Sequence, residues 1–244
     1  MTQRETAISI IQRLHEAGYE AFLVGGCVRD ELRGVDPEDY DISTSAQPEE
    51  VEELFAKTVG VGKSFGVMMV LESGNQFEVA TFRADGDYED GRRPKEVKFA
   101  DAQTDAGRRD FTVNGLFLNP VTNKVHDWVG GETDLKSRTL RTIGDPVERF
   151  GEDHLRLLRA VRFAAQLDFQ IDPTTFSAVQ EHAAKVASVS AERIRDELLK
   201  LFRPTHAARG LDLLRESGLL KHVLPELMPT IDCEQTPDYH PEGN

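Results

Sequence analysis

Hydrophobic and polar positions follow two different periods along the chain, and the change falls near residue 145. Before that point, the short apolar run AFLV (21–24) predicts a buried strand. Residues 67–83 and 113–131 each predict a hairpin, with turns at Ser73-Gly74-Asn75 and at Asn119-Pro120. After it, apolar residues recur at helical spacing, first over residues 148–167 and then in FSAVQEHAAKVASV, AERIRDELLKLF and ARGLDLLRESGLL. The pattern predicts an α/β region followed by an all-helical one.

The first half also contains helical segments and one polar loop. An N-terminal helix begins the chain, and CVRDELRG (27–34) predicts a second that ends at Gly34. Residues 40–44, with Asp39 before them, predict a strand, and Ser45 is the expected N-cap of the helix that follows. The polar stretch ADGDYEDGRRPKEV (84–97) has little to bury and predicts a surface loop.

Composition limits the class of protein. The chain has 244 residues, of which 39% are hydrophobic, and it has no apolar run long enough to span a membrane. The N-terminus lacks the continuous apolar core of a signal peptide, so we expect a cytoplasmic protein. Cys27 and Cys233 are too few for a disulfide framework, and we expect both to be packing residues without a disulfide partner.

Charge is distributed unevenly. The formal net charge is −14, which argues against a basic surface over the whole protein but does not exclude nucleic acid as a partner. Six arginines fall within one short segment: Arg138, Arg141, Arg149, Arg156, Arg159 and Arg162. A solvated helix face is the simplest interpretation of such a run.

Two carboxylates are the first candidate for chemistry. Residues i and i+2 of a strand point to the same face, so Asp39 and Asp41 project together while Tyr40 and Ile42 point toward a core. Mg²⁺ would relieve the repulsion between them, because it binds one or two carboxylates together with water and substrate phosphates. A solvated acidic loop end is the alternative, and an isolated Asp-x-Asp favours it.

Two glycines favour the metal site over the solvated loop end. Gly25 and Gly26 lie between a predicted strand and a helix, where the backbone can approach a phosphate closely. The spacing is neither that of a dinucleotide-binding fingerprint nor that of a Walker loop. Arg29, one turn into the helix, would add a cation beside bound phosphates. A phosphate loop followed by a carboxylate pair suggests a Mg²⁺-bound nucleoside triphosphate.

Four motifs in order carry a family resemblance over residues 20 to 200: GGCVRD, the Asp39/Asp41 pair, RRDFTVN (108–114) and EDHLRLLRAVRF (152–163). The chain resembles the class II tRNA nucleotidyltransferases, or CCA-adding enzymes, and the bacterial poly(A) polymerases, within the polymerase β-like nucleotidyltransferase superfamily. The resemblance implies an α+β head with a mixed sheet and flanking helices (1–145) and an all-α neck that selects the nucleotide (146–225). Residues 226–244 would begin a truncated body or tail region.

The resemblance also implies roles in the head. Asp39 and Asp41 would be catalytic and bind two Mg²⁺ ions, with Glu78 as a candidate third ligand that could equally be an exposed strand residue. Gly25, Gly26, Arg29 and Arg109 match positions that bind the nucleotide. Asp110 would either orient Arg109 through a salt bridge or cap a helix.

In the neck, Asp153 and Arg156 are three residues apart and would be neighbours on one helix face. An ordinary salt bridge is one interpretation. The other is that an acceptor beside a donor complements the edges of adenine and cytosine, and leaves buried groups unpaired with guanine or uracil. Arg159 and Arg162 match further nucleotide-contacting positions of the family.

The predicted function is therefore addition of C and A from CTP and ATP to tRNA 3′ ends. The loop FRADGDYEDGRRPKEV resembles one associated with enzymes that add the terminal adenosine. An A-adding enzyme or poly(A) polymerase with the same chemistry is the nearest alternative. The RRD and neck motifs argue against an enzyme that modifies small molecules, and the intact Asp39/Asp41 pair argues against an inactive nucleotide- or RNA-binding module.

Overall fold

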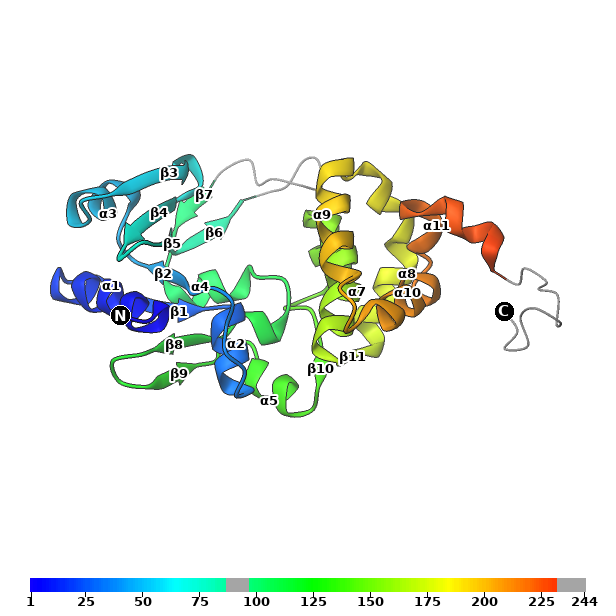
Figure 1. The fold of residues 1–244 in the computed structure, drawn as a ribbon, viewed down its shortest axis with the longest axis horizontal. Coiled ribbons are helices and arrows are strands. Elements are labelled where there is room, and N and C mark those ends of the chain that lie inside the picture. The colour runs from blue at the N-terminus through cyan, green and yellow to red at the C-terminus, as the bar shows by residue number, and fades with distance from the viewer. Residues whose placement is uncertain (87–96, 232–244) are drawn as a thin grey trace. The chain divides into compact units, whose positions relative to one another are not determined.

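The computed structural model describes residues 1–86 and 97–231 (Figure 1). These residues form two compact units, one ending at Asp145 and the other beginning at Pro146. The first unit is built on a sheet and the second on helices, so the change of period near residue 145 marks a real change of architecture. No helix among the described residues is long and apolar enough to cross a membrane.

The first unit contains a seven-stranded sheet in the order β3-β4-β5-β2-β1-β8-β9. β2 pairs with β5 in parallel, and every other neighbouring pair is antiparallel, which confirms the predicted mixed sheet. Both predicted hairpins are present, as β4–β5 and β8–β9. The strands are β1 (Ala21–Val24), β2 (Asp41–Thr44), β3 (Thr58–Gly62), β4 (Val67–Glu72), β5 (Asn75–Thr81), β8 (Phe117–Asn119) and β9 (Lys124–His126).

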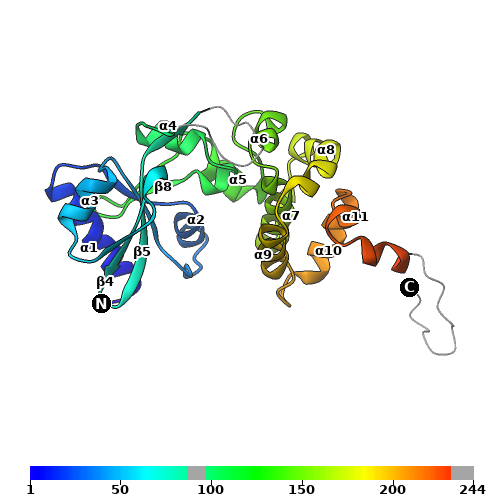
Figure 2. The ribbon, with the colours of Figure 1, turned by 90° about the horizontal axis from the view of Figure 1, so that it is seen from above.

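The sheet has a hydrophobic core on each face, because side chains alternate along its strands. Leu23 and Ile42 point to the face covered by α1 (Gln3–Glu16) and α3 (Pro48–Leu54), which lie on the same side of β4 and β5 in Figure 2. Phe22, Val24 and Phe117 point to the opposite face and pack with α4. The remaining helices of this unit are α2 (Gly26–Leu32), α4 (Ala102–Gly107), α5 (Gly131–Lys136) and the 3₁₀ turns η1 (Lys63–Phe65) and η2 (Thr112–Asn114), and a short strand, β10, covers Thr139–Leu140.

Cys27 is buried in the core, as predicted for a packing residue, and burial raises the pKa of its thiol to about 12. Cys233 lies outside the described residues.

Local structure differs from the expectations at three places. The N-cap of α3 is Gln47 rather than Ser45, since Gln47 and Glu50 form a reciprocal capping box. Strand β3 was missed because its sequence, TVGVG, contains glycines that weaken any strand pattern. The ends of the predicted loop 84–97 are strands, because β6 (Arg83–Asp85) pairs with β7 (Val97–Phe99). The rest of that loop, residues 87–96, lies outside the described residues.

The second unit is a helical bundle in which α7 packs against both α9 and α10. The single helix predicted over 148–167 is two helices, α6 (Pro146–Glu152) and α7 (Leu155–Leu167), separated at Asp153 and His154. The other elements are the strand β11 (Gln170–Ile171), α8 (Pro173–His182), η3 (Ala183–Ser188), α9 (Ala191–Leu201), α10 (Ala207–Glu216), α11 (Leu220–Val223) and η4 (Pro225–Thr230). Of the expected body segment, only residues 226–231 are described.

Candidate active site

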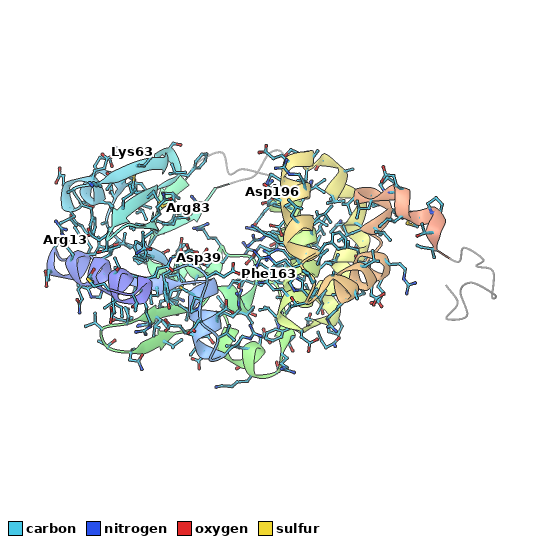
Figure 3. The ribbon with its side chains drawn as sticks, viewed as in Figure 1. Arg13, Asp39, Lys63, Arg83, Phe163 and Asp196 are labelled. Atoms are coloured by element: carbon cyan, nitrogen blue, oxygen red, sulfur yellow. The ribbon has the colours of Figure 1, made fainter. Side chains whose placement is uncertain are left out.

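The predicted carboxylate pair lies at the start of β2. Strand β2 begins at Asp41, and Asp39 precedes it as an exposed residue (Figure 3). Tyr40 and Ile42 are buried in the core that α1 and α3 cover. Asp41 pairs in register with Val24, so it lies on the opposite face of the sheet, which confirms the predicted alternation.

Asp41 lies in an environment that disfavours its charge. The pKa of Asp41 is raised to about 7, chiefly by burial and then by the nearby carboxylates of Glu78 and Asp39, while Arg109 opposes the rise. A half-buried carboxylate surrounded by two others is a site of unbalanced negative charge. A divalent cation is the kind of ligand that would relieve it.

Strand pairing explains how Glu78 reaches this group. β2 and β5 are parallel with Ile42 opposite Val79, and the residue before each of these is Asp41 on β2 and Glu78 on β5. Glu78 itself is exposed. Among the described residues, no group of three or more His, Cys, Asp or Glu side chains is arranged closely enough to hold a metal ion. Two carboxylates, completed by water and phosphate oxygens, are a donor set of the kind that Mg²⁺ binds.

The glycine pair forms a turn next to two guanidinium groups. Gly25 has a φ of 72° and a ψ of −127°, a conformation that only glycine adopts readily. A Cβ at Gly25 would lie 3.1 Å from Nη1 of Arg109, and one at Gly26 would lie 3.7 Å from Nη2 of Arg29. The absence of side chains at both positions therefore keeps the backbone in close contact with two cations.

Arg29 is fixed in place by two neighbours. Its side chain is almost fully buried and donates to both carboxylate oxygens of Asp30, at 2.9 and 2.7 Å. Its Nη1 donates to Oδ1 of Asn114 at 2.7 Å. These contacts hold the Arg29 guanidinium in one orientation, and the Asp30 carboxylate partly neutralises its positive charge.

Arg109 is oriented by Asp105 rather than by Asp110. Its Nε and Nη2 donate to Oδ2 of Asp105 at 3.3 and 3.0 Å, and Nη2 also donates to Oγ of Ser43 at 3.1 Å. The expected salt bridge from Asp110 is wrong, because Asp110 accepts hydrogen bonds from the Phe111 backbone and from the Asn114 side chain, and it is not the N-cap of the 3₁₀ turn that follows. No described residue accepts a hydrogen bond from Nη1 of Arg109, the atom beside Gly25.

The neck residues Asp153 and Arg156 do not form the expected pair on a helix. Asp153 precedes α7, and its carboxylate accepts from the Leu155 N–H at 3.1 Å and from Arg193 at 2.8 Å. Arg156, inside α7, pairs with the Glu152 carboxylate and donates to the Arg149 carbonyl at 3.0 Å. The helix break between α6 and α7 gives each residue its own partner, so neither neutralises the other.

Arg159 and Arg162 follow on α7 and share one acidic partner, the buried Glu197 of α9. Arg162 is buried, donates to Gln166 at 2.9 Å and lies 3.8 Å from the ring centroid of Phe163, which Figure 3 labels. Arg159 is more exposed. The interpretation of the arginine run as a solvated helix face does not hold for Arg162, because this side chain packs between α7 and α9.

Sequence reasoning missed four residues that hold this site together: Asp30, Ser43, Asp105 and Asn114. Asp105 could have been found, because it lies three and four residues before Arg108 and Arg109 and pairs with both. Asn114 contacts Arg29 from 85 residues away, and local spacing carries no signal for that.

Comparison with known proteins matches both units. Residues 21–141 match the family described as "Poly A polymerase head domain". Residues 168–231 match the one described as "Probable RNA and SrmB- binding site of polymerase A". The chain is 43% identical over 218 residues to the CCA-adding enzyme of Bacillus licheniformis, a match that covers 89% of this chain and 55% of that enzyme.

Two solved structures have a similar fold. The Bacillus stearothermophilus CCA-adding enzyme in complex with CTP matches with a TM-score of 0.82 and 40% identity, over 90% of this chain and 53% of that one. A tRNA nucleotidyltransferase complexed with a primer tRNA and an incoming ATP analog matches with a TM-score of 0.75 and 27% identity, over 88% and 62%.

The fold and the matched families define a poly(A) polymerase-type head followed by a helical region. The chain belongs to the family of tRNA nucleotidyltransferases and poly(A) polymerases, and it is similar to CCA-adding enzymes. It spans about half the length of the curated relatives that it matches.

Proposed function

We propose that the chain is an RNA 3′-end nucleotidyltransferase that adds C and A from CTP and ATP to tRNA, without a nucleic-acid template. The observation that carries this proposal is Asp41, whose carboxylate is half-buried beside Asp39 and Glu78 and faces Arg109. Its relatives named CCA-adding enzymes, one of them solved with CTP, support the choice of substrate.

Asp39 and Asp41 are the proposed ligands of two Mg²⁺ ions. Bound magnesium would lower the pKa of the RNA 3′-hydroxyl and neutralise charge on the phosphates. In the reaction, the 3′-oxygen of the RNA attacks the α-phosphorus of the nucleotide, and the bond to the bridging oxygen breaks to release pyrophosphate. Catalysis of this kind depends on positioning and on charge stabilisation.

Gly25, Gly26, Arg29 and Arg109 are the proposed triphosphate-binding group. The glycine turn lets phosphate oxygens approach the backbone, and the Nη1 group of Arg109 lies beside it as a donor with no acceptor among the described residues. Asp105 and Ser43 hold the Arg109 guanidinium in this orientation before the nucleotide arrives. Preorganised donors are effective because they need no rearrangement when charge develops.

Asp153 and Arg156 are the proposed base-reading pair, with Arg159 and Arg162 as further nucleotide-contacting residues. Arg193 fixes Asp153 and Glu152 fixes Arg156, so the acceptor and the donor are separately positioned. Such a pair would accept the edges of cytosine and adenine and would leave buried groups unpaired with guanine or uracil.

An assay with tRNA ending at the discriminator base tests the reaction, the substrate and the nucleotide choice together. With Mg²⁺, we expect cytidine incorporation from CTP alone and completion of CCA when ATP is added. Adenosine added only to tRNA that already ends in CC would indicate an A-adding enzyme, and long adenosine tails would indicate a poly(A) polymerase. Failure to bind or incorporate any nucleotide would overturn the proposal.

A further inference from the structure

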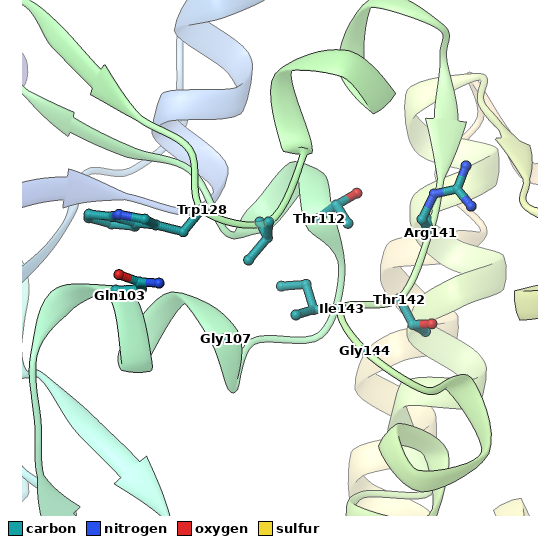
Figure 4. A pocket seen from close by; sticks show the side chains of 9 residues that line it. Gln103, Gly107, Thr112, Trp128, Arg141, Thr142, Ile143 and Gly144 are labelled. Carbon is teal, nitrogen blue, oxygen red and sulfur yellow. The ribbon is translucent and has the colours of Figure 1, made fainter.

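The head unit contains a pocket of about 430 Å³ that the proposed reaction does not use (Figure 4). It lies on the face of the sheet that α4 covers, between α4, η2, the connection from β9 to α5, and residues 141–144. Its volume falls in the range of small-molecule sites. The residues that matter for its chemistry are Gln103, Thr112, Trp128, Val129, Arg141 and Ile143.

The pocket is separate from the proposed triphosphate group, although Phe117 touches both. The Arg109 guanidinium carbon lies 4.9 Å from the Phe117 ring centroid, and the Trp128 ring meets the same ring edge-on with centroids 5.6 Å apart. Neither Asp41 nor the glycine turn lines the pocket. A ligand bound there would therefore be additional to the reacting nucleotide.

Trp128 provides a fixed aromatic surface. The side chain is 37% exposed, yet its ring is held by Phe117 and by His126, whose ring centroid lies 5.3 Å away. An indole that is both exposed and held by neighbouring rings suits the stacking of a planar ligand. Val129 and Ile143 form an apolar part of the pocket wall.

Gln103 provides the polar partner. It is exposed on α4 and extends toward the same side of the pocket as the Trp128 ring in Figure 4. No described residue forms a hydrogen bond with the Gln103 amide or with the Trp128 indole N–H. A side-chain amide offers a donor next to an acceptor, which is the pattern found along the edge of a nucleobase.

We propose that this pocket binds a nucleobase, stacked on Trp128 and hydrogen-bonded at its edge by Gln103. The base could belong to a free nucleoside or nucleotide, or to an unpaired residue of an RNA, since both present the same planar heterocycle. Arg141, which pairs with Asp134, places a cation at the pocket without being required for recognition of the base.

Trp128 is the only tryptophan of the chain, so its fluorescence reports directly on this pocket. The chain would be titrated with adenosine and with cytidine, without Mg²⁺. These probes carry no phosphate and therefore cannot engage the proposed triphosphate group. A third arm uses a short single-stranded RNA. We expect saturable quenching, and tighter saturation by RNA than by nucleoside would identify an RNA base as the ligand, whereas the reverse would identify a free nucleoside.

Variants test the geometry. Gln103→Leu should weaken adenosine binding several-fold, whereas Gln76→Leu, at an exposed glutamine of β5, should leave it unchanged. Trp128→Ala should weaken it by about tenfold or more when binding is followed by equilibrium dialysis with radiolabelled adenosine. Quenching that rises linearly without saturating, or binding unchanged in both pocket variants, would overturn the proposal. Because no step of nucleotide transfer is involved, a chain inactive in transfer would still give either result.

Discussion

The carboxylate of Asp105 holds the guanidinium of Arg109 four residues further along the chain, with Nη2 of Arg109 3.0 Å from Oδ2 of Asp105. The same carboxylate pairs with Arg108, and its side chain is almost completely buried. A buried carboxylate with two guanidinium partners thus orients Arg109, which lies beside Gly25 and interacts electrostatically with Asp41. Asp105 is a positioning residue for the proposed active site.

Replacing Asp105 by asparagine should destabilise the head, because it leaves two arginines without their buried partner. We expect a loss of about 3 kcal/mol in the free energy of unfolding, measured by urea denaturation. Asp101→Asn is the matched control, since Asp101 caps α4 from an exposed position and asparagine caps equally well. Equal effects of the two substitutions would contradict the role of Asp105.

The same carboxylate predicts a dependence of stability on acid pH. Burial works against the ionised form of Asp105, but Arg109 and Arg108 outweigh it, so the pKa in the folded state is below its ordinary value. The folded state therefore holds this proton less tightly than the unfolded state does. The stabilisation is fully present above the ordinary carboxyl pKa of about 4 and is lost as the pH falls through the lowered value.

Urea denaturation tests whether this stabilisation is lost as the pH falls. Midpoints are measured for the wild-type chain and for Asp105→Asn, from neutral pH down into the acid range. The difference in stability between the two should shrink as the pH falls below about 4. A difference that stays constant with pH would show that Asp105 acts through packing alone.

Much of the head could be predicted from local pattern. Strand alternation placed Asp41 and Ile42 on opposite faces of the sheet, and the turn residues fixed both hairpins. The residues that orient the arginines were harder to find. Asp105 is one helical turn from Arg109 and its spacing could have indicated the pair, but nothing in the sequence ranks Asp30, adjacent to Arg29, above other acidic residues.

The neck shows where periodicity fails. Apolar residues continue at helical spacing through residues 148–167, so the pattern predicts one helix, but the backbone breaks at Asp153 and His154. The Asp153 side chain accepts a hydrogen bond from the Leu155 N–H at the start of α7, as short acidic side chains do at helix N-termini. Its other partner, Arg193, is 40 residues away, which local spacing cannot reveal.

Asp41 predicts a link between metal binding and stability. In the absence of divalent cations, Asp41→Asn should raise the free energy of unfolding by about 1 kcal/mol or more, because it removes a half-buried charge that Glu78 and Asp39 repel. Mg²⁺ should raise the melting temperature of the wild-type chain and not that of the variant. The same substitution should lower nucleotide transfer by at least about 100-fold.

The melting temperatures of the wild-type chain and of Asp41→Asn are measured by calorimetry, once with EDTA and once with Mg²⁺. Glu72→Gln, at a half-buried glutamate at the far end of the β4–β5 hairpin, is the control and should keep the response of the wild-type chain to Mg²⁺. A wild-type melting temperature that does not respond to Mg²⁺ would contradict the assignment of Asp39 and Asp41 as ligands.

The separate partners of Asp153 and Arg156 predict how nucleotide choice can be altered. Alanine at either position should reduce discrimination against GTP and UTP, because the base edge loses one of its two fixed contacts. Arg193→Ala should have a smaller effect in the same direction, since Asp153 would keep only its hydrogen bond from Leu155. The measurement is kcat/KM for each of the four nucleotides, and unchanged ratios in all three variants would rule out base reading by this pair.

Alanine substitutions at Gly25 and at Gly34, which have the same φ, should differ in their effect on nucleotide binding. Gly25 and Gly34 both have a φ of 72°, so alanine is strained at each, by about 1–3 kcal/mol. A Cβ at Gly34 meets nothing within 4 Å, whereas one at Gly25 would press on Nη1 of Arg109 at 3.1 Å. Both Gly25→Ala and Gly34→Ala should therefore lose stability, but only Gly25→Ala should displace Arg109 and raise the KM for CTP and ATP. Urea denaturation and nucleotide titrations on the two variants separate strain from the contact, and equal KM values would show that the Arg109 guanidinium does not bind the nucleotide beside this turn.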